Sequence, residues 1–225
     1  MNILRNFKVR YKERPNIYAF RVLFWLYILI TFLFVERFNF MILNLALAYI
    51  PLEISVVIDN TDYKEGRINK MKYWMLLLLW LFFYPNSPYL ITDFFHLAKL
   101  NYMDTVIRSR FTTNPYVWKH FAYMATGVIL GIGMGLLSLK IIYRSFIDSI
   151  KKVNSVIFVT TISFLSSYAI YVGRFLRLHS LDLIIAPLIT LERILSVFSL
   201  KFFYFIIYMT IVQIIIYIVW KLIKD

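Results

Sequence analysis

Long apolar blocks alternate with short charged segments along the whole chain. The blocks occupy residues 20–36, 38–58, 73–92, 117–139, 155–173 and 202–220. Each is close to the roughly 20 residues that a helix needs to cross a bilayer, and they lack the two-residue alternation of membrane β-strands. The pattern predicts an all-α, polytopic transmembrane helix bundle of about six spans. We expect residues 1–225 to form a single integral membrane domain.

A further apolar stretch, residues 183–200, does not fit this series. Its sequence, LIIAPLITLERILSVFSL, carries Glu192 and Arg193 near the middle. Charged side chains at that depth are costly in lipid. We therefore expect a helix that lies on the outer surface of the membrane or re-enters it, with a seventh span as the alternative.

The third block is interrupted by the sequence PNSP, residues 85–88. The apolar run from Tyr73 to Tyr84 spans only about 18 Å as a helix, whereas the hydrocarbon core is about 30 Å thick. Pro85 and Pro88 donate no backbone hydrogen bond, so the third span should break between them, inside the membrane. Ser87 is the expected N-cap of a new helix.

Charge and composition fix the environment and the expected orientation. The chain is 61% hydrophobic and carries a formal net charge of +13. Its basic residues flank the apolar blocks, which argues against nucleic acid and for the lipid bilayer as the main partner. Their excess on one side predicts cytoplasmic N- and C-termini. The absence of cysteine excludes disulfides, thiolate metal sites and cysteine nucleophiles.

Candidate chemistry begins just after the break. Asp93 and His96 are three residues apart, so they share one helix face and are candidates for a catalytic proton transfer. Asn86 and Ser87 lie at the expected N-terminus of the new helix, where an anion could bind. The alternative is a proline kink whose polar residues only cap the helix ends.

A second polar segment, GRFLRLHSLDL, follows the fifth block. Arg174 and Arg177 could hold a carboxylate or phosphate, with Asp182 beside them. Alternatively they reach lipid phosphates, or pair with Asp93 and Asp182 as a salt-bridge network. The histidines and aspartates of the two segments suit a metal by type, but their spacing is common, so we predict no metal and no cofactor.

Polar residues and glycines within the blocks have simpler interpretations. Glu53 is a candidate for a proton or cation path, unless it only reaches the inner interface. Asn44 and Gln213 are expected to form hydrogen bonds between helices, and Gly127, Gly131 and Gly135 to let two helices approach closely.

The segments YPNSPYLITDFFHL and GRFLRLHSLDL resemble domain-of-unknown-function family 1361, uncharacterised bacterial multi-pass membrane proteins. The resemblance implies a bacterial plasma (inner) membrane location and brings no activity. We expect an accessory or scaffold protein of the cell envelope, with another envelope membrane protein as a candidate partner. The alternatives are an outer-face enzyme or binding site for an anionic or lipid-linked substrate, and a small-solute or ion transporter.

Overall fold

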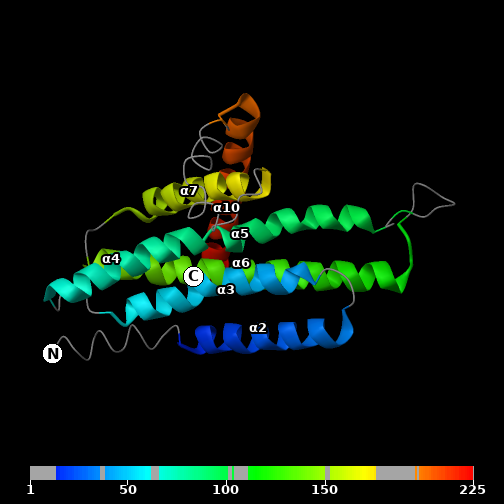
Figure 1. Cartoon of the computed structure of the whole chain (residues 1–225), viewed down its shortest axis with the longest axis horizontal. Helices are drawn as coiled ribbons and strands as arrows, with labels where there is room; N and C mark the ends of the chain where they lie inside the picture. Colours follow the sequence, from blue (N-terminus) through cyan, green and yellow to red (C-terminus); the bar gives the residue numbers. More distant parts are fainter. Residues whose placement is uncertain are drawn as a thin grey trace. The chain divides into compact units, whose positions relative to one another are not determined.

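The computed structural model describes residues 14–35, 39–61, 66–100, 103, 111–149, 153–175, 196 and 198–224. In this part of the chain the elements are α2 (Arg14–Phe34), α3 (Phe40–Asp59), α4 (Gly66–Phe83), α5 (Asn86–Tyr89), the 3₁₀-helix η1 (Leu90–Lys99), α6 (Pro115–Ser149), α7 (Ser155–Phe175) and α10 (Leu200–Lys224) (Figure 1). Most of the expected helix near 183–200 lies outside the described residues.

The predicted transmembrane helix bundle is confirmed. Six helical segments are long and apolar enough to cross a membrane: Pro15–Phe34, Phe40–Asp59, Gly66–Lys99, Pro115–Ile147, Ser155–Phe175 and Leu200–Ile223. Each contains most or all of one predicted apolar block. The chain is therefore an integral, multi-pass membrane protein. By contact it divides into two compact units, Met1–Ser145 and Phe146–Asp225.

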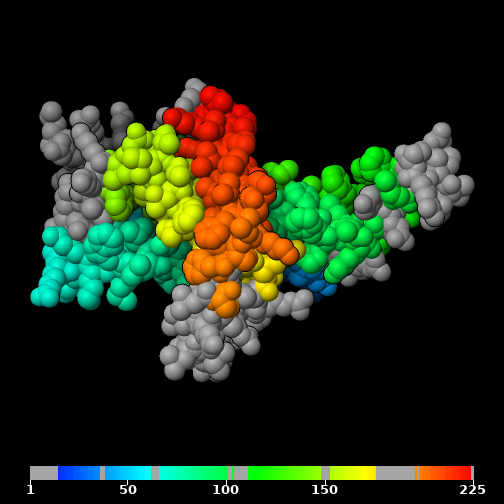
Figure 2. Space-filling view, turned by 90° about the horizontal axis from the view of Figure 1, so that it is seen from above, coloured from blue at the N-terminus to red at the C-terminus, as the bar shows by residue number. Residues whose placement is uncertain are grey.

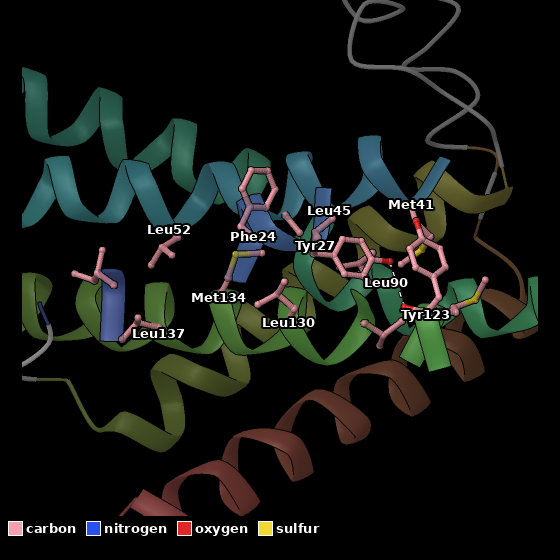
Figure 3. Close-up of a cluster of buried hydrophobic side chains, with 14 of the residues drawn as sticks. Phe24, Tyr27, Met41, Leu45, Leu52, Leu90, Tyr123, Leu130, Met134 and Leu137 are labelled. Carbon is pink, nitrogen blue, oxygen red and sulfur yellow. Dashed lines mark hydrogen bonds between the residues drawn. The ribbon is translucent and has the colours of Figure 1, made fainter. Parts of the chain in front are cut away.

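The core of the first unit joins α2, α3, η1 and α6. Side chains labelled in Figure 3 include Phe24 and Tyr27 of α2, Leu45 of α3, and Leu90 of η1, which pack against α6. The Tyr27 ring stacks on Tyr123 at 5.0 Å between centroids, and its hydroxyl donates to the Tyr123 carbonyl oxygen at 3.2 Å. In lipid, such close packing and internal hydrogen bonds are what hold helices together.

The glycines of α6 provide the closest approaches in this core. A Cβ atom added at Gly127 would lie 2.5 Å from the Tyr27 hydroxyl oxygen, and one at Gly135 would lie 2.5 Å from the Ser87 Cβ. At Gly131 the nearest atom would be the Cδ1 of Leu90, at 2.0 Å. The predicted role of these glycines in helix packing is confirmed.

In the second unit, a polar contact and a small aromatic cluster join α7 to α10. Phe202 is buried against Tyr168 and Tyr171, and Gln213 Nε2 donates to Ser167 Oγ at 2.8 Å, which confirms the predicted hydrogen bond between helices. The outward side chains of α10, orange to red in Figure 2, form an uncovered apolar column. Such a column suits contact with lipid chains.

Candidate functional site

The third span breaks where the prolines predicted. Helix α4 ends at Phe83, and the four-residue α5 and the 3₁₀-helix η1 continue the same membrane segment to Lys99 (Figure 1). Across the break, the backbone N–H of Ser87 donates to the Tyr84 carbonyl at 3.1 Å, and that of Tyr89 to the Pro85 carbonyl at 3.0 Å. The backbone therefore turns through the break without losing its local hydrogen bonds at these positions.

The polar side chains at and just after the break donate hydrogen bonds to backbone carbonyl oxygens. Asn86 Nδ2 donates to the Phe83 carbonyl at 2.8 Å, and Thr92 Oγ1 donates to the Tyr89 carbonyl at 2.7 Å. Ser87 Oγ reaches across to α3 and donates to the Ala48 carbonyl at 3.2 Å. Interrupted backbone is tolerated in a membrane when protein groups satisfy it in this way.

The expectation that Ser87 caps the new helix is wrong. Pro85 occupies the N-cap position of α5, and no side chain forms the capping hydrogen bond. Ser87 is turned away from that position because its hydroxyl bonds α3 while its Cβ packs against Gly135 of α6. The residue is 1% exposed, so it joins three helices.

Asp93 is buried at the junction of η1 and α3. Its side chain has 0% exposure, and its Oδ2 accepts a hydrogen bond from Asn44 Nδ2 at 2.8 Å. This contact confirms Asn44 as a partner between helices. Polar side chains within membrane spans usually pair with one another, and this pair links η1 to α3.

The 3₁₀ form of η1 places Asp93 and His96 on one edge. Residues three apart eclipse each other in such a helix, and His96 Nε2 lies 3.8 Å from Asp93 Oδ1. The His96 ring packs against Phe40 with 4.6 Å between centroids, and its side chain is 26% exposed. Asp93 can orient this imidazole, and the imidazole is the member of the pair that is partly exposed at the protein surface.

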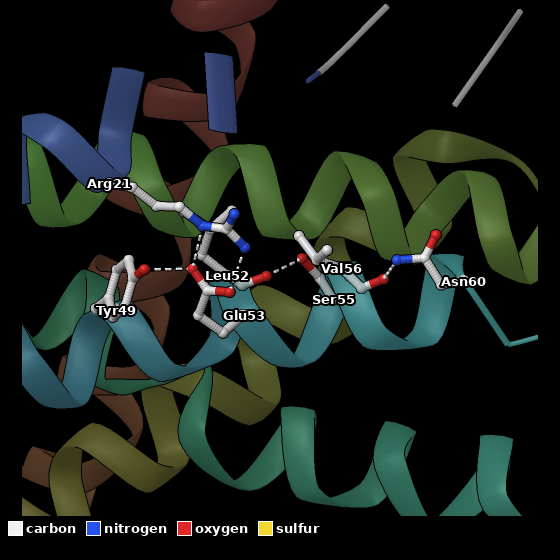
Figure 4. A network of polar contacts seen from close by, with 7 residues as sticks. All are labelled: Arg21, Tyr49, Leu52, Glu53, Ser55, Val56 and Asn60. Atoms are coloured by element: carbon white, nitrogen blue, oxygen red, sulfur yellow. Dashed lines mark hydrogen bonds and ion pairs between the residues drawn. The ribbon is translucent and has the colours of Figure 1, made fainter. Parts of the chain in front are cut away.

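A second polar cluster joins α2 to α3, nearer the C-terminal end of α3. Arg21 of α2 donates two hydrogen bonds to Glu53 of α3, from Nε to Oε1 at 2.8 Å and from Nη2 to Oε2 at 2.6 Å (Figure 4). The Tyr49 hydroxyl also donates to Glu53 Oε1. The sequence analysis singled out Glu53 but missed Arg21 as its partner.

A signal for this pair exists in the sequence. Arg21 lies six residues after the start of the first span and Glu53 six residues before the end of the second. Each position is about 9 Å along its helix from the same side of the membrane. Consecutive spans run in opposite directions, so opposite charges at equal depth on neighbouring spans indicate an ion pair.

The second predicted motif is described only at its start. Arg174 is half-buried in the last turn of α7, in the second unit, while Arg177 and Asp182 lie outside the described residues. Of the predicted site residues, the structure thus brings Asp93 and His96 together and adds Asn44. Among the described side chains, no group of three or more histidine, aspartate or glutamate residues is placed to hold a metal ion.

Comparison with known proteins gives a family but no activity. No curated protein and no solved structure matches the chain. The family described as "Protein of unknown function (DUF1361)" matches residues 43–216, from α3 to α10, and the match includes both polar motifs. It covers well over half of the chain. This multi-pass membrane protein therefore belongs to the DUF1361 family.

Proposed function

We propose that the protein is an accessory or scaffold component of the bacterial cell envelope. It would lie in the plasma membrane and hold another envelope membrane protein. The observation that carries the proposal is the use of Asp93: the side chain first suspected of catalysis is fully buried and bonded to Asn44. Ser87, Glu53 and Gln213 are likewise bonded to neighbouring helices. Intramembrane polar groups used in this way support a rigid framework.

Replacing Asp93 with leucine tests this proposal. Asn44 would keep a buried amide without its acceptor, so we expect a loss of about 2 kcal/mol in the free energy of unfolding and a lower amount of protein in membranes. His96→Gln, on the same edge but accessible, should leave the amount of protein and its function unchanged. Function is measured as rescue of envelope integrity in cells that lack the chain. Normal accumulation of the Asp93→Leu variant would contradict the scaffold role.

The Asp93–His96 pair favours a second candidate, an enzyme or binding site at the outer face for an anionic or lipid-linked substrate. Asp93 would orient His96, and His96 would transfer the proton. The anion-binding roles of Arg174, Arg177 and Asp182, and of Asn86 and Ser87, stay predictions from the sequence. In this case His96→Gln should accumulate normally yet fail to rescue envelope integrity.

The proposal includes cytoplasmic N- and C-termini, which the excess of basic residues on one side supports. Because the chain has no cysteine, single cysteines can test the orientation. Thr113, before α6, and Ile68, near the start of α4, are both exposed. The two helices begin consecutive spans, which run in opposite directions, so these two positions should lie on opposite sides of the membrane. In intact cells a membrane-impermeant thiol reagent should label Thr113→Cys and not Ile68→Cys, and lysis should expose both. The opposite labelling would invert the topology.

A further inference from the structure

The Arg21–Glu53 ion pair is open to its surroundings, although both residues belong to membrane-spanning helices. The two side chains are 33% and 34% exposed, and both positions are about 9 Å along their helices from the same membrane surface. Charged side chains within membrane spans usually face the interior of the bundle or a water-filled cavity. An exposed pair this close to the membrane surface lies instead within reach of lipid headgroups.

Arg21 uses only one of its two forked edges in this pair. A guanidinium presents N–H donors along a side edge, formed by Nε and Nη2, and along an end edge, formed by Nη1 and Nη2. Glu53 occupies the side edge (Figure 4), and Nη1 forms no hydrogen bond within the described part of the chain. The Tyr18 ring lies 5.6 Å from the guanidinium carbon and helps to hold the group in place. The end edge can therefore donate to a phosphate in bidentate fashion.

Glu53 retains acceptor capacity directly beside this end edge. Each oxygen of a carboxylate can accept more than one hydrogen bond. Oε1 accepts from Arg21 Nε and from the Tyr49 hydroxyl, whereas among the described residues Oε2 accepts only from Arg21 Nη2, at 2.6 Å. A positive group that donates to Oε2 would therefore lie next to a negative group bound at the end edge of Arg21.

This arrangement of charges is complementary to a zwitterion. The ion pair has no net charge, so a purely anionic headgroup on Arg21 would meet the Glu53 carboxylate at close range, and like charges repel. A phosphate linked to an ammonium group satisfies both partners. Apolar side chains continue this face of α2 toward the middle of the membrane. Trp25 lies one turn beyond Arg21 and Phe32 seven residues further, and they are 64% and 82% exposed.

We propose that the Arg21–Glu53 pair binds the headgroup of phosphatidylethanolamine. The end edge of Arg21 would hold the phosphate, Glu53 Oε2 would accept from the ammonium group, and an acyl chain would lie along Trp25 and Phe32. Phosphatidylcholine carries the same charges, but its quaternary ammonium has no N–H to donate, and phosphatidylglycerol has no ammonium. The site is independent of the Asp93–His96 pair and goes beyond the proposed scaffold role, because it assigns the chain a lipid ligand.

The test measures binding of these three lipids, with matched acyl chains, to the purified full-length chain by native mass spectrometry. We expect phosphatidylethanolamine to bind about tenfold more tightly than either of the others, as one additional hydrogen bond to a charged group predicts. Soluble phosphoethanolamine at the same concentration should not displace it, because the acyl chain adds to the affinity. Equal binding of the three lipids would overturn the site. Displacement by phosphoethanolamine would assign the pair to a soluble zwitterion and also overturn it.

Two variants test whether the ion pair is responsible for this preference. Arg21→Leu/Glu53→Leu leaves the net charge of the chain unchanged, so general attraction to lipid is preserved. Its preference for phosphatidylethanolamine over phosphatidylcholine should fall from about tenfold to less than about twofold. Glu53→Gln keeps the shape of the side chain but leaves the charge of Arg21 uncompensated, so phosphatidylglycerol should become the most tightly bound of the three lipids.

Each preference is a ratio between lipids bound to the same sample, so it does not depend on how much of a variant is folded. Arg67→Gln, at an exposed position near the start of α4, is the control and should leave the preference unchanged. A preference for phosphatidylethanolamine that persists in Arg21→Leu/Glu53→Leu would place the lipid elsewhere and overturn the site. Phosphatidylglycerol that stays the weaker ligand of Glu53→Gln would contradict the role of the carboxylate.

Discussion

Replacing Glu53 with leucine should lower the free energy of unfolding by about 2–3 kcal/mol. The change leaves the Arg21 guanidinium without its carboxylate, within a membrane-spanning helix. Removing one partner of a buried pair costs about 3–5 kcal/mol. The expected value here is lower because the two side chains are 33% and 34% exposed, and Arg21 can extend toward the nearby membrane surface. The measurement is unfolding of the purified protein in mixed detergent micelles.

A second substitution separates the ion pair from simple packing. In Arg21→Leu/Glu53→Leu both charges are gone, and apolar side chains at this position suit lipid, so stability should return to within about 1 kcal/mol of the original. Tyr49→Phe removes only the hydroxyl that donates to Glu53 and should cost about 1 kcal/mol. The single variant Arg21→Leu completes the comparison. If Arg21→Leu/Glu53→Leu loses as much free energy of unfolding as Arg21→Leu and Glu53→Leu together, Arg21 and Glu53 are not coupled.

The features that sequence predicted well are those fixed by local chemistry. Apolar blocks locate spans because lipid cannot hydrogen-bond the backbone, and the break at Pro85 follows from the missing N–H of proline. The roles of Asn44 and Gln213 followed from the same argument, since an amide inside a membrane protein needs a partner. The start of α4 at Gly66, before the apolar block that begins at Tyr73, was not predictable because hydropathy reports contact with lipid and not the ends of helices.

The features that sequence missed depend on which helices are neighbours. Ser87 satisfies every local rule for an N-cap, yet its hydroxyl bonds Ala48, which is 39 positions away. The partner of Glu53 is 32 positions away, and its only signal is the equal depth of the two charges on consecutive spans, which a local pattern does not report. The 3₁₀ form of η1, which aligns Asp93 with His96, also has no signature in the residues of that segment. At Ser87 a tertiary contact overrode a local preference, and in the other two cases the local sequence carried no preference that could have predicted the contact.

Replacing Gly135 with alanine should destabilise the first unit by about 3 kcal/mol, at the upper end of the range for overpacked cores. The new methyl group would lie 2.5 Å from the Cβ of Ser87. This Cβ is attached directly to the backbone of α5, so the clash cannot be relieved by rotating a side chain. Ser87 Oγ also holds Ala48 of α3, and moving α5 would break that contact. The same unfolding measurement in micelles reports the loss.

Two further variants test whether the clash itself is the cause. Gly173→Ala is the matched control, since a Cβ there meets nothing within 4 Å; alanine inside α7 should leave stability unchanged or raise it by up to about 1 kcal/mol. Ser87→Gly in the Gly135→Ala background removes the clashing Cβ and should recover part of the loss, less the hydrogen bond to Ala48. If Gly135→Ala is as harmless as Gly173→Ala, α5 and α6 are not in contact at Ser87. The three-helix junction inferred for the break would then be wrong.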